Sequence, residues 1–281
     1  MLLELAVGDA YGAGFEYAPR ELVEEFNDGR TYRKHPYHDI PAGGYTDDTQ
    51  MSLAIAEALV SGELWTRENL AERFVRAFRR DPRTGYSSAF YRFLWETRNG
   101  TAFLENIRPD SDKSGAAMRA APLGVLPTVE EVLAKCTVQA RLTHDTPDGI
   151  AAACAAALLT HYYLYDLGPK AEAGRFLERH VPGHPWSEPW QGKVRSKGWM
   201  SVRAAVTAVA ACDRLTDLLR ACVAYTGDVD TVATVALAAA SCSREYERDL
   251  PESLLSGLEN GGYGRDYLVD LDARLMERVQ P

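Results

Sequence analysis

The segment from Val232 to Ala240 is the feature that most constrains the fold of this 281-residue sequence, because Thr234 is its only polar residue. An apolar run of this length predicts a helix that is buried on all sides. The fold must therefore place this helix at its centre.

Helical patterns dominate the rest of the chain. Met51, Ala54, Ile55, Ala58 and Leu59 recur at the spacing of one helix face. Further helices are predicted by capping residues or apolar periodicity: from Thr66, from Thr128 with Glu131, from Thr146-Pro147 to Tyr165, from Trp199 to Ala211, from Leu215 to Ala224, and from about Tyr267 to Val279. No segment alternates like a strand. We predict an all-α fold.

The length and the loops favour one domain over residues 1–281. A single hydrophobic core reaches its limit at roughly 250–300 residues, and nothing in the sequence looks like a domain linker. Glycine and proline gather in three loops, at 33–44, 108–115 and 181–198. The last is interpreted as a long connection in preference to a lid over a substrate.

Charge and cysteine usage narrow the function classes. The formal net charge is −9, which argues against general binding to nucleic acids or anionic membranes. The five cysteines form no CxxC pair and fit reduced, buried thiols. No signal peptide or membrane-spanning run is apparent, so we expect a cytoplasmic protein. We also expect it to work as a monomer.

Two acidic stretches precede apolar helices. Thr46-Asp47-Asp48-Thr49 is the first, and Gly227-Asp228-Val229-Asp230-Thr231 is the second. A helix start favours one Asp or Thr as a cap, so for either stretch alone capping and a functional role are evenly balanced.

Together the two stretches favour a metal centre. Four carboxylates at the start of buried helices would be strongly destabilising unless something neutralised them. Mg²⁺ prefers oxygen ligands and uses few carboxylates per ion, so four Asp with Thr hydroxyls suit two ions better than one. The sequence holds no Cys/His cluster for zinc.

A third acidic group, Asp9 to Glu16, lies among the glycines of Gly8-Asp9-Ala10-Tyr11-Gly12-Ala13-Gly14-Phe15-Glu16. These glycines are costly in a helix but permit a close backbone approach. The order is not that of a dinucleotide-binding loop. A solvated carboxylate near a helix end is the alternative interpretation of Glu16.

These motifs resemble the ADP-ribosylglycohydrolase family. Five motifs occur in family order along almost the whole chain: Gly8–Gly12 with Glu16, Tyr45–Thr49, Gly115–Arg119 with Pro122–Gly124, Thr143–Pro147 and Gly227–Thr231. The resemblance implies an all-α domain with a binuclear Mg²⁺ or Mn²⁺ centre at helix N-termini.

The resemblance also implies residue roles. It assigns metal ligation to Thr46, Asp47, Asp48, Asp228, Asp230 and Thr231, and catalytic roles to Glu16, Asp47 and Asp228. It places the substrate, through its diphosphate, at Ser114, Gly115, Ala116, Met118 and His144. Met118 and Arg119 are expected to support that loop, and His144 is either a ligand contact or structural.

The sequence departs from the family at four positions. Thr226 stands where a second glycine is common, Val229 where threonine is common, and Lys113 and Ser114 where asparagine or glycine is frequent. No predicted ligand is lost, although the specificity for the leaving group is left open. Lys113 is either a phosphate contact or a solvated side chain.

The implied activity is metal-dependent hydrolysis of the glycosidic bond between ADP-ribose and an acceptor on a protein or small molecule. Arginine is the acceptor expected by analogy, with Glu16 as the base or a gate. A non-enzymatic ADP-ribose-binding or crystallin-like protein and a metal-dependent phosphoesterase are the alternatives.

Overall fold

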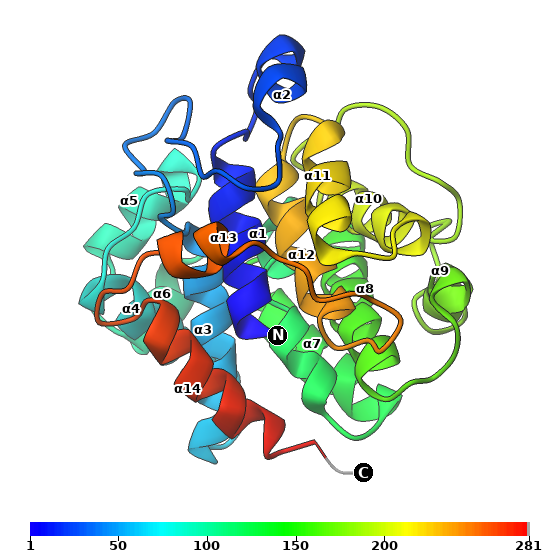
Figure 1. Cartoon of the computed structure of the whole chain (residues 1–281). Coiled ribbons are helices and arrows are strands. Elements are labelled where there is room, and N and C mark those ends of the chain that lie inside the picture. Colours follow the sequence, from blue (N-terminus) through cyan, green and yellow to red (C-terminus); the bar gives the residue numbers. More distant parts are fainter. Residues whose placement is uncertain (280–281) are drawn as a thin grey trace.

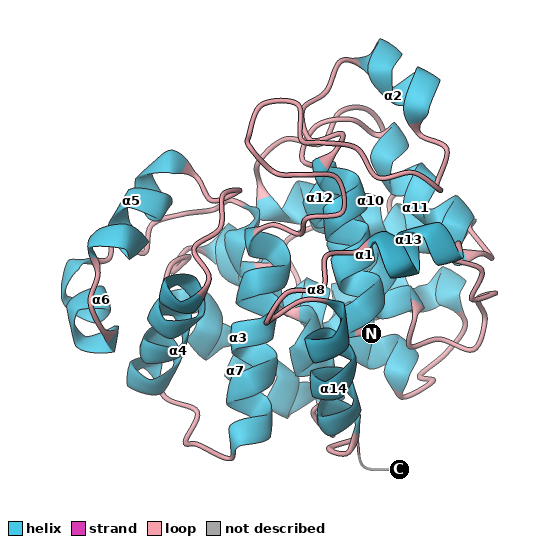
Figure 2. Ribbon diagram, turned by 60° about the vertical axis from the view of Figure 1, so that its left-hand side comes forward, coloured by secondary structure: helices cyan, strands magenta, loops and turns pink. Residues whose placement is uncertain are grey.

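A computed structural model describes residues 1–279, and its regular structure is helical throughout those residues, with four isolated β-bridges and no strand (Figure 2). The α-helices are α1 (Leu2–Ala13), α2 (Arg20–Phe26), α3 (Asp47–Ser61), α4 (Arg67–Arg80), α5 (Ser88–Glu96), α6 (Gly100–Asn106), α7 (Val129–Arg141), α8 (Pro147–Leu164), α9 (Ala173–His180), α10 (Gly198–Ala211), α11 (Leu215–Ala224), α12 (Val229–Ala240), α13 (Glu252–Gly257) and α14 (Arg265–Met276). Three 3-10 helices are η1 (Ser114–Ala116), η2 (Ala121–Val125) and η3 (Lys170–Glu172). The predicted all-α class is confirmed.

Helix α12 lies at the centre, as its apolar sequence predicts. All of its residues are buried. It packs against α1, α8, α10 and α11, and α3 and α4 lie on the far side of α1 (Figure 1). One continuous hydrophobic core joins these helices. None of the described helices is both long enough and apolar enough to cross a membrane.

Three predicted helix starts are confirmed by side-chain caps. The hydroxyl groups of Thr66, Thr128 and Thr146 accept hydrogen bonds from the N–H groups three residues later. Two other starts are earlier than the apolar pattern suggests, because α3 begins at Asp47 and α12 at Val229. Acidic residues therefore occupy the first turns of these helices. Five short helices of six to nine residues are not predicted by the pattern: α2, α5, α6, α9 and α13.

Two glycines let α1 lie directly against α12. A Cβ atom on Gly12 would be 2.5 Å from the Cα atom of Asp230, and one on Gly8 would be 2.6 Å from the carbonyl oxygen of Ala233. Both distances are far below a normal carbon contact of about 3.5–4.0 Å. The predicted close backbone approach is confirmed, and it sets the position of Asp230.

We expect Gly12→Ala to destabilise the protein by about 1–3 kcal/mol, because the added methyl group overpacks the α1–α12 contact. Alanine is the better helix former by ~1 kcal/mol, so a loss would report the steric clash alone. Urea unfolding measures the change. Gly261→Ala is the control, because a Cβ atom there meets nothing within 4 Å. Equal stability of the two variants would contradict the packing argument.

Candidate metal centre and active site

Asp9 anchors the start of α3 from outside that helix. Its fully buried carboxylate accepts hydrogen bonds from the N–H and hydroxyl groups of Thr46, at 2.9 and 2.8 Å, and of Thr49, at 2.9 and 2.6 Å. Four donors thus converge on one carboxylate of α1. The sequence analysis assigns Asp9 no role, because its partners lie 37 and 40 residues away.

The anchoring by Asp9 leaves the two carboxylates of α3 free for another use. Thr46 is the N-cap residue, and its hydroxyl accepts the N–H of Asp48 at 3.3 Å. Asp48 is buried, and its Oδ1 atom has no hydrogen-bond partner. Asp47 is half-buried. The capping function that one of these residues could serve is therefore already filled.

The start of α12 presents a matching pair. Asp228 is the N-cap residue, yet its carboxylate makes no capping bond and instead accepts the Ser201 hydroxyl at 3.2 Å. The Oδ1 atom of Asp230 is buried without a partner. Glu16, Asp228 and Asp230 each contribute one carboxylate oxygen to a group of three atoms that lie within 4.8 Å of one another. Glu16 thus joins the residues that could hold a metal ion.

The acidic residues at the start of α3 and of α12 have raised pKa values, and they act on one another electrostatically. Burial first, and neighbouring carboxylates second, raise the pKa of Asp47 and Asp48 well above the ordinary range. The same causes raise the pKa of Asp230, and that of Asp228 to about 7. Asp228 is among the charges that act on both Asp47 and Asp48. The charges at the start of α3 therefore act on those at the start of α12, whereas the carboxylates that lie within 4.8 Å of one another are those of Glu16, Asp228 and Asp230.

The cluster fits a hard divalent cation. Its donors are all oxygens, and two of the carboxylate oxygens, on Asp48 and Asp230, are buried with no partner. Thr231 is buried too, and its hydroxyl lowers the pKa of Asp48 relative to burial alone. Mg²⁺ and Mn²⁺ favour such donors, and a cation would offset the cost of burying several like charges.

Glu16 is held by a histidine that the sequence analysis does not identify. The Oε2 atom of Glu16 lies 2.7 Å from Nε2 of the buried His35. On the other side of the ring, Nδ1 accepts the N–H groups of Tyr37 and His38, at 3.0 and 3.1 Å. Nδ1 is therefore unprotonated, and Nε2–H donates to Glu16. No local motif surrounds His35.

The predicted diphosphate loop adjoins the acidic cluster. Ser114 lowers the pKa of Asp228 relative to burial alone, and Gly115 faces the ring of His144. Ala116 and Met118 are buried beneath the loop, and the carbonyl group of Met118 accepts the Ser52 hydroxyl at 3.2 Å. Ser114 and Gly115 are half-buried, and His144 is buried. Lys113 is exposed.

The long connection at 181–198 braces this site. Val194 donates its N–H to the carbonyl of Thr226 at 3.0 Å and accepts the N–H of Asp228 at 3.2 Å. Lys197 forms an ion pair with Asp112 ahead of the diphosphate loop. The connection therefore joins the start of α12 to the segment ahead of the diphosphate loop. The sequence analysis predicts only a long connection here.

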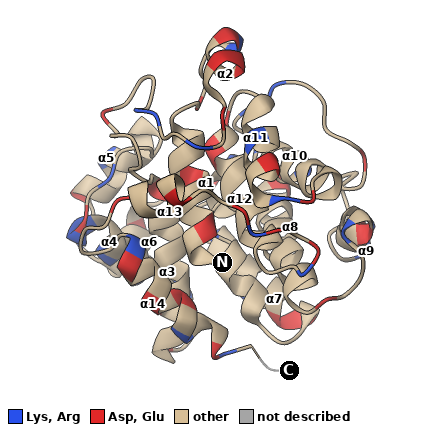
Figure 3. Cartoon of the chain, in the orientation of Figure 1, with Lys and Arg blue, Asp and Glu red and all other residues tan. Residues whose placement is uncertain are grey.

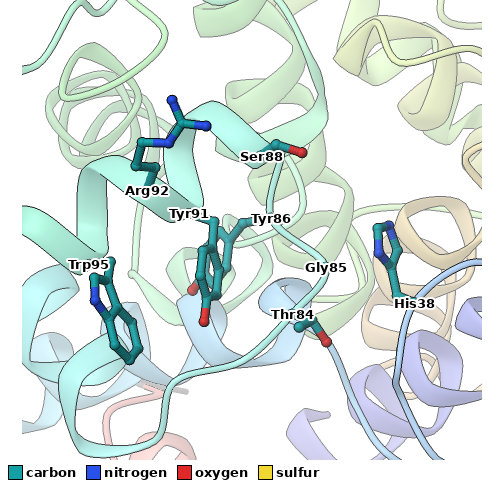
Figure 4. A pocket seen from close by; sticks show the side chains of 8 residues that line it. All are labelled: His38, Thr84, Gly85, Tyr86, Ser88, Tyr91, Arg92 and Trp95. Atoms are coloured by element: carbon teal, nitrogen blue, oxygen red, sulfur yellow. The ribbon is translucent and has the colours of Figure 1, made fainter.

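A pocket of about 510 Å³ lies beside Asp47, and Figure 4 shows the side chains that line it. Its floor includes Gly85, whose φ is +118° and where a Cβ atom would lie 2.4 Å from Oδ1 of Asp47. The rings of Tyr91 and Trp95 stack at 6.1 Å, and Arg92 points away from the tyrosine ring (Figure 4). The pocket is lined by His38, Thr84, Gly85, Tyr86, Ser88, Tyr91, Arg92 and Trp95.

The chain belongs to the ADP-ribosylglycohydrolase family, since the sequence model of that family matches residues 1–281. The ADP-ribosyl-dinitrogen reductase glycohydrolase of Rhodospirillum rubrum is 27% identical over 92% of this chain and 88% of its own length. An ADP-ribosylarginine hydrolase of Serratia proteamaculans is 25% identical over 83% of this chain and 67% of its own length.

A solved chain of an ADP-ribosylglycohydrolase-related protein complex matches with a TM-score of 0.78 and 26% identity, over 99% of this chain and 96% of that one. The predicted family and its fold are confirmed. The chain is thereby placed among glycosidases that act on ADP-ribosyl bonds.

We expect Asp230→Asn to raise stability in EDTA on the order of 1–2 kcal/mol, because it removes one of several mutually repelling buried charges. Added Mn²⁺ should stabilise the wild-type protein and leave the variant nearly unchanged. Urea unfolding with EDTA and with Mn²⁺ measures both effects. Asp270→Asn, at an exposed carboxylate on α14, is the control. A wild-type protein indifferent to Mg²⁺ and Mn²⁺ would rule out the metal centre.

Proposed function

We propose that this protein hydrolyses the bond between the anomeric carbon of ADP-ribose and an acceptor, and releases free ADP-ribose. The observation that carries the proposal is the group of Glu16, Asp228 and Asp230, whose carboxylate oxygens lie within 4.8 Å of one another. A glycosidase that forms a cationic sugar in its transition state needs carboxylates beside the ribose. A diphosphate needs backbone N–H donors at the adjoining position.

The predicted ligand set supports two divalent cations, held by Thr46, Asp47 and Asp48 at one helix start and by Asp228, Asp230 and Thr231 at the other. When bound, Mg²⁺ or Mn²⁺ ions supply positive charge that binds ribose hydroxyls and lowers the pKa of water. Glu16 accepts a proton from the attacking water, and His35 fixes the direction of its carboxylate. The loop at Ser114, Gly115 and Ala116 binds the diphosphate, with Met118 beneath it and His144 at its side.

We propose arginine as the acceptor, on a protein or on a small molecule. The name of the Serratia proteamaculans relative, an ADP-ribosylarginine hydrolase, supports this choice. The pocket beside Asp47 gives the acceptor a place next to the cluster. Aromatic faces such as those of Tyr91 and the 59% exposed Trp95 attract a guanidinium group.

Charge distribution is compatible with a protein substrate. Lys and Arg are interspersed with Asp and Glu on outer helices such as α2, α4 and α9 (Figure 3). In this view the basic residues do not form a continuous surface. The alternatives, a binding protein without activity and a phosphoesterase that cleaves the diphosphate, differ from the proposal in the products they yield.

We expect a panel of ADP-ribosylated substrates, incubated with Mg²⁺ or Mn²⁺, to yield free ADP-ribose, with arginine adducts cleaved fastest. Asp47→Ala and Asp228→Ala should each lower kcat/KM at least about 100-fold, because each removes a metal ligand. Chromatography identifies the products. AMP with a 5-phosphoribosyl group left on the acceptor would indicate a phosphoesterase, and the absence of any product would favour the binding protein.

We expect Trp95→Ala to raise KM for an ADP-ribosyl-arginine substrate about 3- to 5-fold, which is the size of one exposed cation–π contact. The dissociation constant of ADP-ribose should stay unchanged, because that product lacks the acceptor. Steady-state kinetics and calorimetry separate the two effects. Leu64→Ala, at a 78% exposed residue on another loop, is the control. An unchanged KM in Trp95→Ala would exclude this pocket as the acceptor site.

A further inference from the structure

Arg119 is a buried cation without a buried anion beside it. Its side chain is 1% exposed, and no carboxylate in residues 1–279 forms an ion pair with it. The guanidinium instead donates to Oε1 and the carbonyl oxygen of Gln139, at 2.7 and 3.0 Å, and to Oγ1 of Thr143 at 2.9 Å. The Gln139 side chain in turn donates to the carbonyl oxygen of Ala116 at 3.0 Å. Arg119 is therefore tied to the diphosphate loop.

The hydrogen bonds of Arg119 determine the protonation of His144. A guanidinium has donors only, so Oγ1 of Thr143 is the acceptor in its bond to Arg119. The remaining partner of that hydroxyl in residues 1–279 is Nδ1 of His144, at 2.7 Å. If the hydroxyl proton goes to Nδ1, both hydrogen bonds of the Thr143 hydroxyl have one donor and one acceptor. Nδ1 is then bare, and the single proton of the neutral ring is on Nε2.

The imidazole ring stays neutral at physiological pH. Burial, followed by the charges of Arg119 and Lys113, lowers the pKa of His144 to about 3. A second proton on Nδ1 would also place a donor against the donating hydroxyl.

The edge of the ring that carries the Nε2 proton faces the diphosphate loop. A Cβ atom on Gly115 would lie 3.0 Å from Cε1 and 3.3 Å from Nε2 of His144. The His144 side chain is 6% exposed, yet within residues 1–279 its Nε2 atom has no hydrogen-bond partner. The Nε2–H group is therefore available to a ligand at this loop, because no group within the described residues accepts its proton.

We propose that Arg119 and Thr143 are positioning residues that hold His144 as the Nε2–H tautomer, so that it donates a hydrogen bond to an anionic diphosphate oxygen bound at Gly115. The donation to diphosphate rests on the proposed function, whereas the tautomer is a property of the free protein. The buried charge of Arg119 adds attraction for an anion at the same loop.

Histidine ¹⁵N NMR on the full chain tests the tautomer directly. Long-range ¹H–¹⁵N spectra distinguish protonated from bare ring nitrogens, and loss of one signal set in His144→Gln assigns the residue among six histidines. We expect the wild-type protein to show Nε2 protonated and Nδ1 bare. Thr143→Val, which removes the hydroxyl but keeps the shape, should give a mixture of tautomers. Thr143→Ser should restore the wild-type spectrum.

Calorimetry with ADP-ribose tests the donation. We expect Thr143→Val to weaken ADP-ribose binding about 10-fold, the effect of one hydrogen bond to a charged group, with Thr143→Ser close to the wild-type protein. A thermal melt of each variant verifies that it is folded. Wild-type affinity and a wild-type tautomer in Thr143→Val would overturn the inference, as would a proton on Nδ1 in the wild-type protein. If the wild-type protein binds no ADP-ribose, the proposed function fails, and the spectra of the free protein still decide the role of Thr143.

Discussion

The carboxylate of Asp9 is the point on which the site depends. It takes two backbone and two hydroxyl donors from the start of α3, so this helix is capped by a residue of α1. A helix that is capped from outside has no need of its own acidic residues for that purpose. Asp47 and Asp48 are therefore held at the start of α3 while their carboxylates remain available. Two adjacent carboxylates, which a cap alone would not explain, follow from this arrangement.

The second half of the cluster depends on how closely α1 and α12 approach. Gly8 and Gly12 remove the side chains that would separate these helices, and Gly12 lies directly on the backbone of Asp230. The turn after α1 then continues to Glu16, and the N–H of Tyr17 donates to the carbonyl oxygen of Gly227 at 2.8 Å. Helix α1 thus positions both acidic pairs. Its Asp9 anchors the start of α3, and its glycines let α12 lie close to it.

The parts of this arrangement that lie within one stretch of sequence could be predicted, whereas the individual hydrogen bonds that join distant stretches could not. Caps such as Thr66 and Thr146 are visible because donor and acceptor are three residues apart. The motifs that carry the family resemblance are continuous too. Asp9, His35 and Ser201 act on partners that are 19 to 40 residues away, and no periodicity reports such a pairing. The short helix α5, which supplies half of the residues that line the pocket, lies below the length at which an apolar pattern recurs.

Residues 226–228 form a turn that the long connection at 181–198 holds in place. This turn also bears on the balance of charge between the acidic cluster and Arg119. Val194 holds residues 226–228 through two backbone hydrogen bonds, and φ is +61° at Thr226 and +97° at Gly227. Threonine is disfavoured in that region, which glycine adopts readily. The strained turn directs Asp228 into the cluster, where acidic groups lack cations, while Arg119 under the adjoining loop lacks an anion. A ligand that combines divalent cations with a diphosphate neutralises both, whereas a neutral sugar would leave Arg119 uncompensated.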